Sequence, residues 1–194
     1  MDFDGNNTAN TNALLLTDPQ FAKLATYVNS ATVYHCPADG SRIRRNGQMY
    51  PRVRSIAMNE AVGSNSDAYL LSANARWKTF RKQDDITMPS PSGLWVMIEQ
   101  HPDSIEDDRF AVDCQSQNEQ ARWIDFPAYS HGRSCGISFA DGHSEIHKWV
   151  DSITMPPVKY CGCLADYAAN GYYTSCPNSP DMAWLQARTS APKN

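Results

Sequence analysis

The sequence predicts an α+β fold in which short antiparallel strands and long loops accompany one N-terminal helix. Three observations predict this class: a helical pattern near the start of the chain, two short apolar runs in its middle, and a hairpin signature at residues 136–149. Parallel βαβ units need helices that alternate with the strands, and the sequence offers no such alternation. The polar, Asn-rich residues 1–17 are typical of a linker or frayed terminus, so we expect residues 18–194 to form a single globular domain.

The predicted helix covers residues 18–28. Asp18 can cap it and Pro19 occupies the first helical position. Its apolar residues recur at helical spacing and fall on one face: Phe21, Leu24 and Val28.

Short strands are predicted at residues 32–35, 53–58 and 94–99, because each is a brief run of apolar or β-branched residues ended by turn residues. Residues 76–81 could add an edge strand. Near the end of the chain, a short amphipathic segment is centred on residues 182–185.

The hairpin is the clearest local pattern. Ile137 and Phe139 alternate with small or polar residues, and the mixed run 144–149 follows after Asp141-Gly142. Asp-Gly is a preferred pair for a two-residue turn, because both central positions of that turn need a positive φ. The stretch therefore predicts two antiparallel strands joined by a tight turn.

Charge and hydropathy exclude two classes of protein. The net charge is -4 and the densest basic run, residues 42–45, is short, so we expect no nucleic-acid partner. No stretch approaches the roughly 20 apolar residues that span a bilayer. The apolar run 13–16 is too short for a signal-peptide core and no basic residue precedes it. We therefore expect either a cytoplasmic protein or one whose leader and anchor lie outside the sequence as given.

Six cysteines leave the redox state open between disulfides and reduced structural thiols: Cys36, Cys114, Cys135, Cys161, Cys163 and Cys176. Cys161 and Cys163 are separated by one glycine and are not expected to bridge each other. A bridge from either of them to Cys176 would close the loop between.

A spaced motif surrounds the hairpin. His131 precedes Asp141-Gly142, and residues 132–140, nine in all, separate them. This pattern resembles the prepilin-type processing-associated H-X9-DG domain of pseudopilin-like proteins. Further segments resemble landmarks of that family in the same order along the chain: residues 36–39, 54–59, 95–110 and 178–185.

The resemblance implies a pilin-like globular head, a structural subunit of a type II secretion or type IV pilus-like filament and not an enzyme. Its partners would be other pilin-like subunits and secretion or pilus assembly proteins, in the cell envelope, the periplasm or an extracellular filament. Family members normally begin with a basic leader, a Gly-Phe cleavage site and a long apolar helix with an early Glu. Because this sequence lacks them, we expect it to be the head alone, with a sheet that packs on the missing helix. Membrane contact would come only through that helix, which anchors the full-length form in the inner membrane.

Imidazole and carboxylate groups near the hairpin could ligate Zn²⁺ or a similar ion. The candidates are His131, Asp141 and His143, joined by His101 and Asp103 from a preceding loop. We favour a structural interpretation, in which Asp141 forms the turn and His131 hydrogen-bonds to hold the loop before the hairpin. No cofactor is therefore expected.

The acidic loop 103–108 could bind Ca²⁺, but it lacks the spacing and glycine of an EF-hand, so we favour a solvated loop. One alternative function is a metal- or thiol-dependent enzyme around His131, Asp141 and His143, with Cys135 as nucleophile. No recognised catalytic motif accompanies these residues.

A further alternative is a cell-surface module that binds glycans through aromatic residues of the C-terminal region. The residues concerned are Trp149, Tyr160, Tyr167, Tyr172, Tyr173 and Trp184. Tyr and Trp are enriched at interfaces, but the same side chains could fill a small core under a long loop. The sequence leaves both interpretations open.

Overall fold

The computed structural model describes residues 7–63, 76–162, 164 and 173–193. Within these residues the fold is α+β, with nine strands that pair mostly antiparallel and two α-helices, as predicted. No helix among the described residues is long and apolar enough to cross a membrane.

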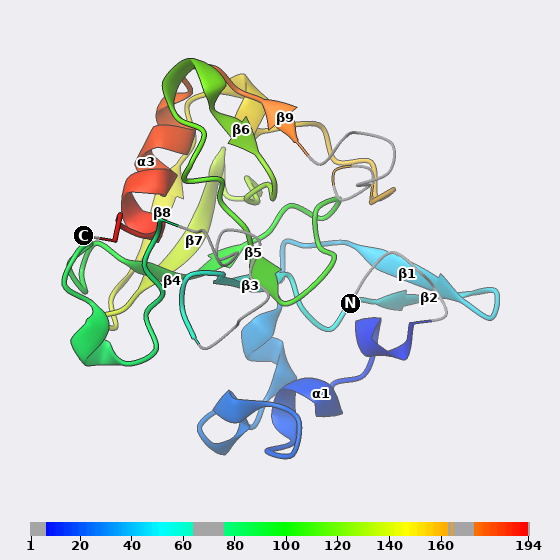
Figure 1. The fold of residues 1–194 in the computed structure, drawn as a ribbon. Coiled ribbons are helices and arrows are strands. Elements are labelled where there is room, and N and C mark those ends of the chain that lie inside the picture. The colour runs from blue at the N-terminus through cyan, green and yellow to red at the C-terminus, as the bar shows by residue number, and fades with distance from the viewer. Residues whose placement is uncertain (1–6, 64–75, 163, 165–172, 194) are drawn as a thin grey trace.

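A five-stranded sheet forms the centre of the molecule, in the order β5-β3-β4-β7-β8 (Figure 1). All neighbours in it are antiparallel except β3 and β5, which are parallel. The predicted strands at 53–58 and 94–99 are confirmed with shifted boundaries. The five strands are β3 (Ile56–Asn59), β4 (Trp95–Glu99), β5 (Arg109–Phe110), β7 (Ser134–Phe139) and β8 (Ser144–Lys148).

The hairpin β7–β8 is confirmed, but its turn is not the two-residue type. The Phe139 N–H donates to the His143 carbonyl at 2.9 Å, and the Gly142 N–H donates to the Phe139 carbonyl at 3.0 Å. Of the loop residues only Gly142 has a positive φ, +94°. This is the pattern of a three-residue loop in which glycine takes the left-handed position.

One face of the sheet carries the main core. Ile137 and Phe139 of β7 point into it, as do Trp95 and Ile98 of β4. A register shift between Trp95 and Met97 marks a β-bulge, and this extra residue allows Trp95 and Ile98, three positions apart, to be buried together.

Helix α3 (Pro180–Thr189) covers that face. The Ser179 hydroxyl caps its first turn by accepting from the Met182 N–H, and Pro180 occupies the first helical position. At its other end the Thr189 hydroxyl accepts a 2.9 Å hydrogen bond from the indole N–H of Trp95. The amphipathic segment predicted around residues 182–185 is thus the middle of a helix that seals the core.

Two small ribbons flank the sheet. The first pairs β1 (Arg42–Arg45) with β2 (Gln48–Pro51) through Asn46 and Gly47, both at positive φ. Asn-Gly is a strong hairpin signal, and this ribbon is not among the elements predicted above. The second ribbon pairs β6 (Arg122–Trp123) with β9 (Thr174–Ser175).

The predicted N-terminal helix is wrong. Residues 18–28 form turns and the 3-10 helix η2 (Lys23–Thr26), and the only α-helix nearby is the single turn α1 (Leu14–Thr17). Phe21 and Leu24 are 62% and 41% exposed. A short helix needs a packed apolar face for stability, and these side chains have none.

The rest of the N-terminal segment also differs from expectation. Residues 32–35 fall in the 3-10 helix η3 (Ala31–Tyr34) and its cap, not in a strand. Residues 7–17 are not uniformly frayed, because Asn10, in η1 (Thr8–Asn10), is buried and its carbonyl accepts from the Val53 N–H at 3.0 Å. Three further 3-10 turns complete the fold: η5 (Gln83–Asp85), η6 (Asn118–Gln120) and η7 (Ser152–Thr154).

Residues 76–81 form no strand, and only isolated bridges join Trp77 to Pro192 and Val62 to Phe80. A bridge to Cys176, one of the alternatives that the sequence leaves open, is not formed, since Cys176 is a free thiol. Cys36, Cys114 and Cys135 are free as well. Cys161 is disulfide-bonded. The expectation for the Cys161–Cys163 pair lies outside the described residues, because Cys163 is not among them.

Candidate functional site

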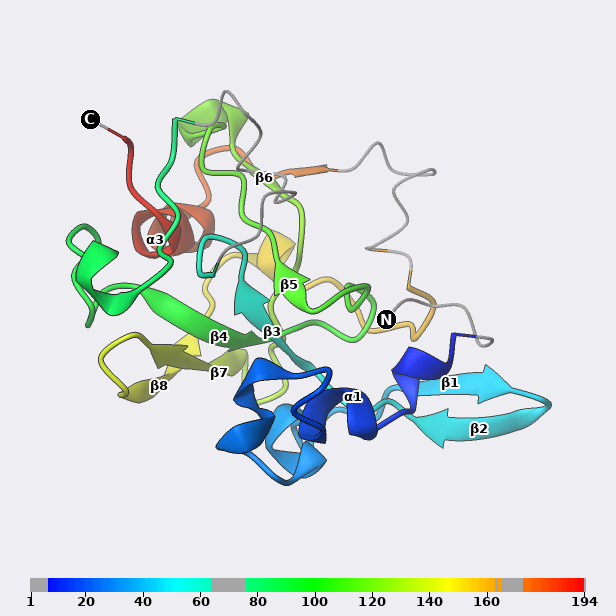
Figure 2. The same ribbon diagram turned by 60° about the horizontal axis from the view of Figure 1, so that its bottom comes forward.

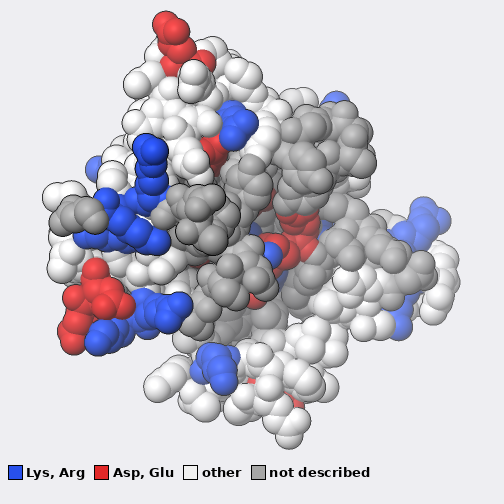
Figure 3. Space-filling view, in the orientation of Figure 1, with Lys and Arg blue, Asp and Glu red and all other residues white. Residues whose placement is uncertain are grey.

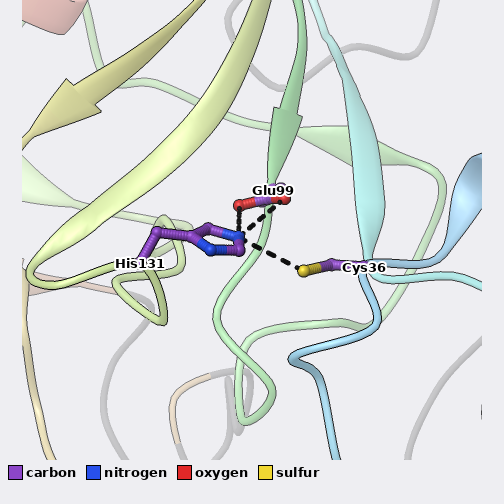
Figure 4. A group of neighbouring side chains, drawn as sticks. All are labelled: Cys36, Glu99 and His131. Atoms are coloured by element: carbon purple, nitrogen blue, oxygen red, sulfur yellow. Dashed lines mark hydrogen bonds and ion pairs between the residues drawn. The ribbon is translucent and has the colours of Figure 1, made fainter.

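Three side chains from distant parts of the chain meet at one end of the central sheet (Figure 4). Cys36 lies in the loop after η3, Glu99 is the last residue of β4, and His131 lies in the loop before β7. Each offers one metal-binding atom, and these three atoms all lie within 4.8 Å of one another. Among the described residues this is the one group of three such side chains that could share an ion.

The imidazole nitrogen Nε2 of His131 is the meeting point. It lies 3.3 Å from the Cys36 sulfur and 3.3 and 3.2 Å from the two carboxylate oxygens of Glu99. The Cys36 residue is only 7% exposed, whereas the His131 side chain is 36% exposed. The cluster is therefore closed on the sulfur side and open to solvent on the histidine side.

The backbone around the cluster fixes Cys36 and Glu99. The Cys36 N–H donates to the Ser55 hydroxyl at 2.8 Å, and the Ala38 N–H donates to the Cys36 sulfur at 3.4 Å. The Gly136 N–H of β7 donates to Glu99 Oε2 at 2.9 Å. A Cβ at position 136 would lie 3.4 Å from the Glu99 carboxyl carbon, so glycine leaves the carboxylate its place.

The loop before β7 presents His131. Its N–H donates to the Ser134 carbonyl at 3.1 Å, and both Gly132 and Arg133 adopt positive φ, which turns the chain sharply into the strand. This agrees with the predicted role of His131 in a hydrogen-bonded loop. Its partners Cys36 and Glu99 were not among the predicted site residues.

The chemistry of the cluster does not resemble a cysteine nucleophile with its base. Burial, aided by the neighbouring Glu99 carboxylate, raises the pKa of the Cys36 thiol. In a catalytic triad the acid binds one imidazole nitrogen and the nucleophile the other. Here sulfur and carboxylate both approach the same nitrogen, so the geometry provides no proton relay from Cys36 through the ring to Glu99.

The other members of the predicted motif lie elsewhere. Asp141 and Gly142 are in the turn after β7, at the end of that strand opposite His131. Asp141 forms a local pair with His143 at 2.6 Å, and the His143 ring stacks on Phe139 with a centroid distance of 4.3 Å. The structure therefore does not bring His131, Asp141 and His143 together.

His101 and Asp103 are buried and have structural partners. The His101 Nε2 faces the Pro156 carbonyl at 3.0 Å, and its Nδ1 accepts from the Asp103 N–H at 3.1 Å. The Asp103 carboxylate accepts from three backbone N–H groups, those of Lys159, Cys161 and Gly162. These bonds hold the 156–162 loop, and neither residue is a member of the Cys36–Glu99–His131 group.

The acidic loop 103–108 is only partly solvated, contrary to expectation, since Asp103 and Ser104 are buried. Asp107 pairs with Arg109 at 2.9 Å. Burial raises the pKa of Glu106 to about 8. Cys135 is fully buried, and burial raises the pKa of its thiol well above the ordinary value, so it is no nucleophile for the hairpin histidines.

The aromatic residues do not form one exposed face. Trp149 is fully buried, and Trp184 stacks on His147 at a centroid distance of 3.7 Å beside it. Tyr173 lies under the guanidinium of Arg122 at 3.6 Å. Tyr160 is 56% exposed, whereas Tyr167 and Tyr172 lie outside the described residues. The two tryptophans thus belong to the core, as the second interpretation predicted.

The second face of the sheet is open. An exposed groove runs across β3, β4, β7 and β8 next to the cluster, and it is lined mainly by apolar and small side chains together with Glu99 and Glu145. Ile146 is 65% exposed. The open face, as we call it, consists of Ile56, Met97, Glu99, Gly136, Ser138, Ser144 and Ile146.

Charge is dispersed over the side of the molecule in Figure 3, where Lys and Arg appear in separate places and not as one stripe. No protein-family model, curated protein or solved structure matches the chain.

Proposed function

We propose that the chain is the head of a pilin-like filament subunit, which acts by packing against other subunits. The observation that supports this most is the open face. The mostly antiparallel sheet has one face sealed by α3, while its other face exposes mainly apolar and small side chains in a groove. Sheets with one buried face normally present polar residues on the other, so an apolar second face favours a protein contact.

The shape of the open face suits a helix. Gly136 and Ser138 of β7 form its floor, with Ser144 beside them, and the larger side chains of Met97 and Ile146 stand on either side. Small residues in the middle let a partner backbone approach closely, and large residues at the rim supply buried area. A pilin-like apolar helix, the element that the H-X9-DG resemblance leads us to expect, would fit this groove.

The N-terminal segment lies on the opposite side of the sheet from α3 (Figure 2). It carries several exposed apolar side chains: Leu14, Phe21, Leu24, Tyr27 and Val33. A second apolar surface next to the open face supports an assembled state in which both are covered.

The proposal can be tested in cells that express the full gene. Ile146→Asp places a charge in the groove without touching the core, and Met88→Asp is the matched control, since Met88 is similarly exposed but lies in a loop outside the open face. We expect Ile146→Asp to remove the protein from sheared surface filaments collected by sedimentation and detected by immunoblot, while Met88→Asp remains.

Normal incorporation of Ile146→Asp would count against the open face as the packing surface. The DNA upstream of the Met1 codon gives a second test. The proposal expects a leader and an apolar segment of about 20 residues in the same reading frame. A ribosome-binding site directly before Met1 would contradict it.

A further inference from the structure

We propose that Cys36, Glu99 and His131 bind a zinc-class divalent cation, which fastens the N-terminal segment to the central sheet. The donor set suits this ion, because Zn²⁺ in proteins takes cysteine sulfur, histidine nitrogen and carboxylate oxygen. Deprotonated Cys36 and ionised Glu99 would together balance the two charges of the ion. The inference is independent of filament assembly.

The distances agree with a shared tetrahedral ion. With zinc–sulfur bonds of about 2.3 Å and zinc–nitrogen and zinc–oxygen bonds of about 2.0 Å, tetrahedral angles separate sulfur from nitrogen by about 3.5 Å and nitrogen from oxygen by about 3.3 Å. The corresponding separations here are 3.3 Å from Cys36 to His131 and 3.2 Å from His131 to Glu99. The third separation, from the Cys36 sulfur to the Glu99 carboxylate, is within 4.8 Å, so all three atoms can close on one ion.

The surrounding groups orient two of the ligands as they do at metal sites. The N–H of Ala38 points at the Cys36 sulfur and the N–H of Gly136 at the Glu99 carboxylate, so each anionic ligand already accepts a backbone hydrogen bond. The partial exposure of His131 leaves room for a water molecule as fourth ligand. A hydrogen bond between His131 and Glu99 alone does not explain why the Cys36 sulfur lies against the same imidazole nitrogen.

The position of the site suggests its role. Cys36 belongs to the segment that precedes β1, whereas Glu99 and His131 belong to β4 and the approach to β7. The segment before Cys36 consists of 3-10 turns and one helical turn, with many exposed side chains. An ion at the cluster would join this weakly packed segment to the most regular part of the fold.

The test uses the full chain, stripped of metal with EDTA and kept without reductant so that the disulfide at Cys161 stays closed. Cobalt(II) serves as the spectroscopic probe and Zn²⁺ as its competitor. We expect one cobalt per chain with a sulfur-to-cobalt charge-transfer band that disappears in Cys36→Ser. His131→Asn and Glu99→Gln should weaken zinc binding by about 100-fold or more, since even outer-shell changes cost 10- to 100-fold.

His143→Asn is the matched control, because His143 is exposed, pairs with a carboxylate and lies at the opposite end of β7. It should bind zinc as the wild type does. Circular dichroism of the metal-free variants checks folding, and Glu99→Gln, which can still accept from Gly136, decides the matter if Cys36→Ser does not fold. The metal site is refuted if the charge-transfer band survives in Cys36→Ser, or if His131→Asn binds zinc as tightly as the wild type. Either result would mean that the three side chains form only a hydrogen-bonded cluster.

The fastening role has its own readout. Zinc should slow tryptic cleavage after Lys23, an exposed residue of η2, in the wild type but not in His131→Asn. Stoichiometric binding with no change in cleavage rate would refute the role while leaving the site.

Discussion

The carboxylate of Asp181 should be one of the strongest single contributions to the stability of this fold. It lies in the first turn of α3 and the residue is 3% exposed. Its Oδ2 accepts from the Asp151 N–H at 2.9 Å, the Val150 N–H at 3.1 Å and the Thr154 hydroxyl at 2.7 Å. The side chain thereby joins the segment after β8 to the helix that seals the core.

Asp181→Ala removes the acceptor from three donors at once. A buried donor left without a partner costs about 1–3 kcal/mol, and such costs do not add fully, so we expect a loss of about 3–5 kcal/mol. That is a large part of the 5–15 kcal/mol typical of a domain. Asp181→Asn should cost less, about 1–2 kcal/mol, because an amide oxygen in the place of Oδ2 keeps these three donors, and what is lost is the charge and the second contact of the Val150 N–H, to Oδ1 at 3.1 Å.

Urea and thermal denaturation followed by circular dichroism measure both variants. For a domain of this size each kcal/mol shifts the midpoint by about 2–4 °C, so Asp181→Ala should melt about 10 °C below the wild type. Glu119→Ala, an exposed carboxylate in η6, is the control and should stay within about 0.5 kcal/mol. The prediction is refuted if Asp181→Ala is as stable as the control, or if Asn and Ala cost the same.

Two further predictions concern proton binding and backbone strain. Burial raises the pKa of Asp125 to about 7, so the folded chain keeps a proton that the unfolded chain releases near pH 4, and stability should fall as the pH rises between these values. Asp125→Asn should flatten this decline, measured by urea denaturation across the pH range. Part of the decline should remain, because the pKa of Glu106 is also raised, to about 8. A wild-type free energy of unfolding that rises with pH over this range would contradict the assignment. Gly142→Ala should cost about 1–2 kcal/mol from its φ of +94° alone, because no atom lies within 4 Å of the added Cβ. Gly142→Asn should cost less in the same denaturation assay, and equal losses would mean that contacts and not backbone conformation decide.

Local chemistry was sufficient to predict the hairpin. Alternating residues on either side of Asp141-Gly142 specify two strands and a turn, and those signals act over a few residues. The turn type was not predicted correctly, because hairpin loops of different length can carry the same Asp-Gly pair. They differ only in which loop position needs a positive φ. The ribbon β1–β2 carried an equally local signal in Asn46-Gly47, so it could have been predicted from the sequence, and we did not predict it.

The predicted helix at residues 18–28 failed for a reason that lies outside the segment. Its spacing of apolar residues is helical, but Phe21 and Leu24 remain exposed, and the side chain of Asp18 instead accepts from the Gln20 N–H at 2.8 Å in a local turn. Helices of this length depend on a packed face. Whether such a face finds a surface to pack against is decided by the rest of the chain.

The candidate site was likewise predictable from the sequence only in part. His131 was recognised from the sequence, because its spacing to Asp141-Gly142 is a local pattern, and Cys36 and Glu99 appeared only as members of separate landmark segments. They meet because β4 pairs with β7 and because Ser55, just before β3, holds Cys36 beside the sheet. Sequence alone determined the hairpin and the residue types. Tertiary structure decided which side chains share a site, since strand pairing brings together residues 95 positions apart.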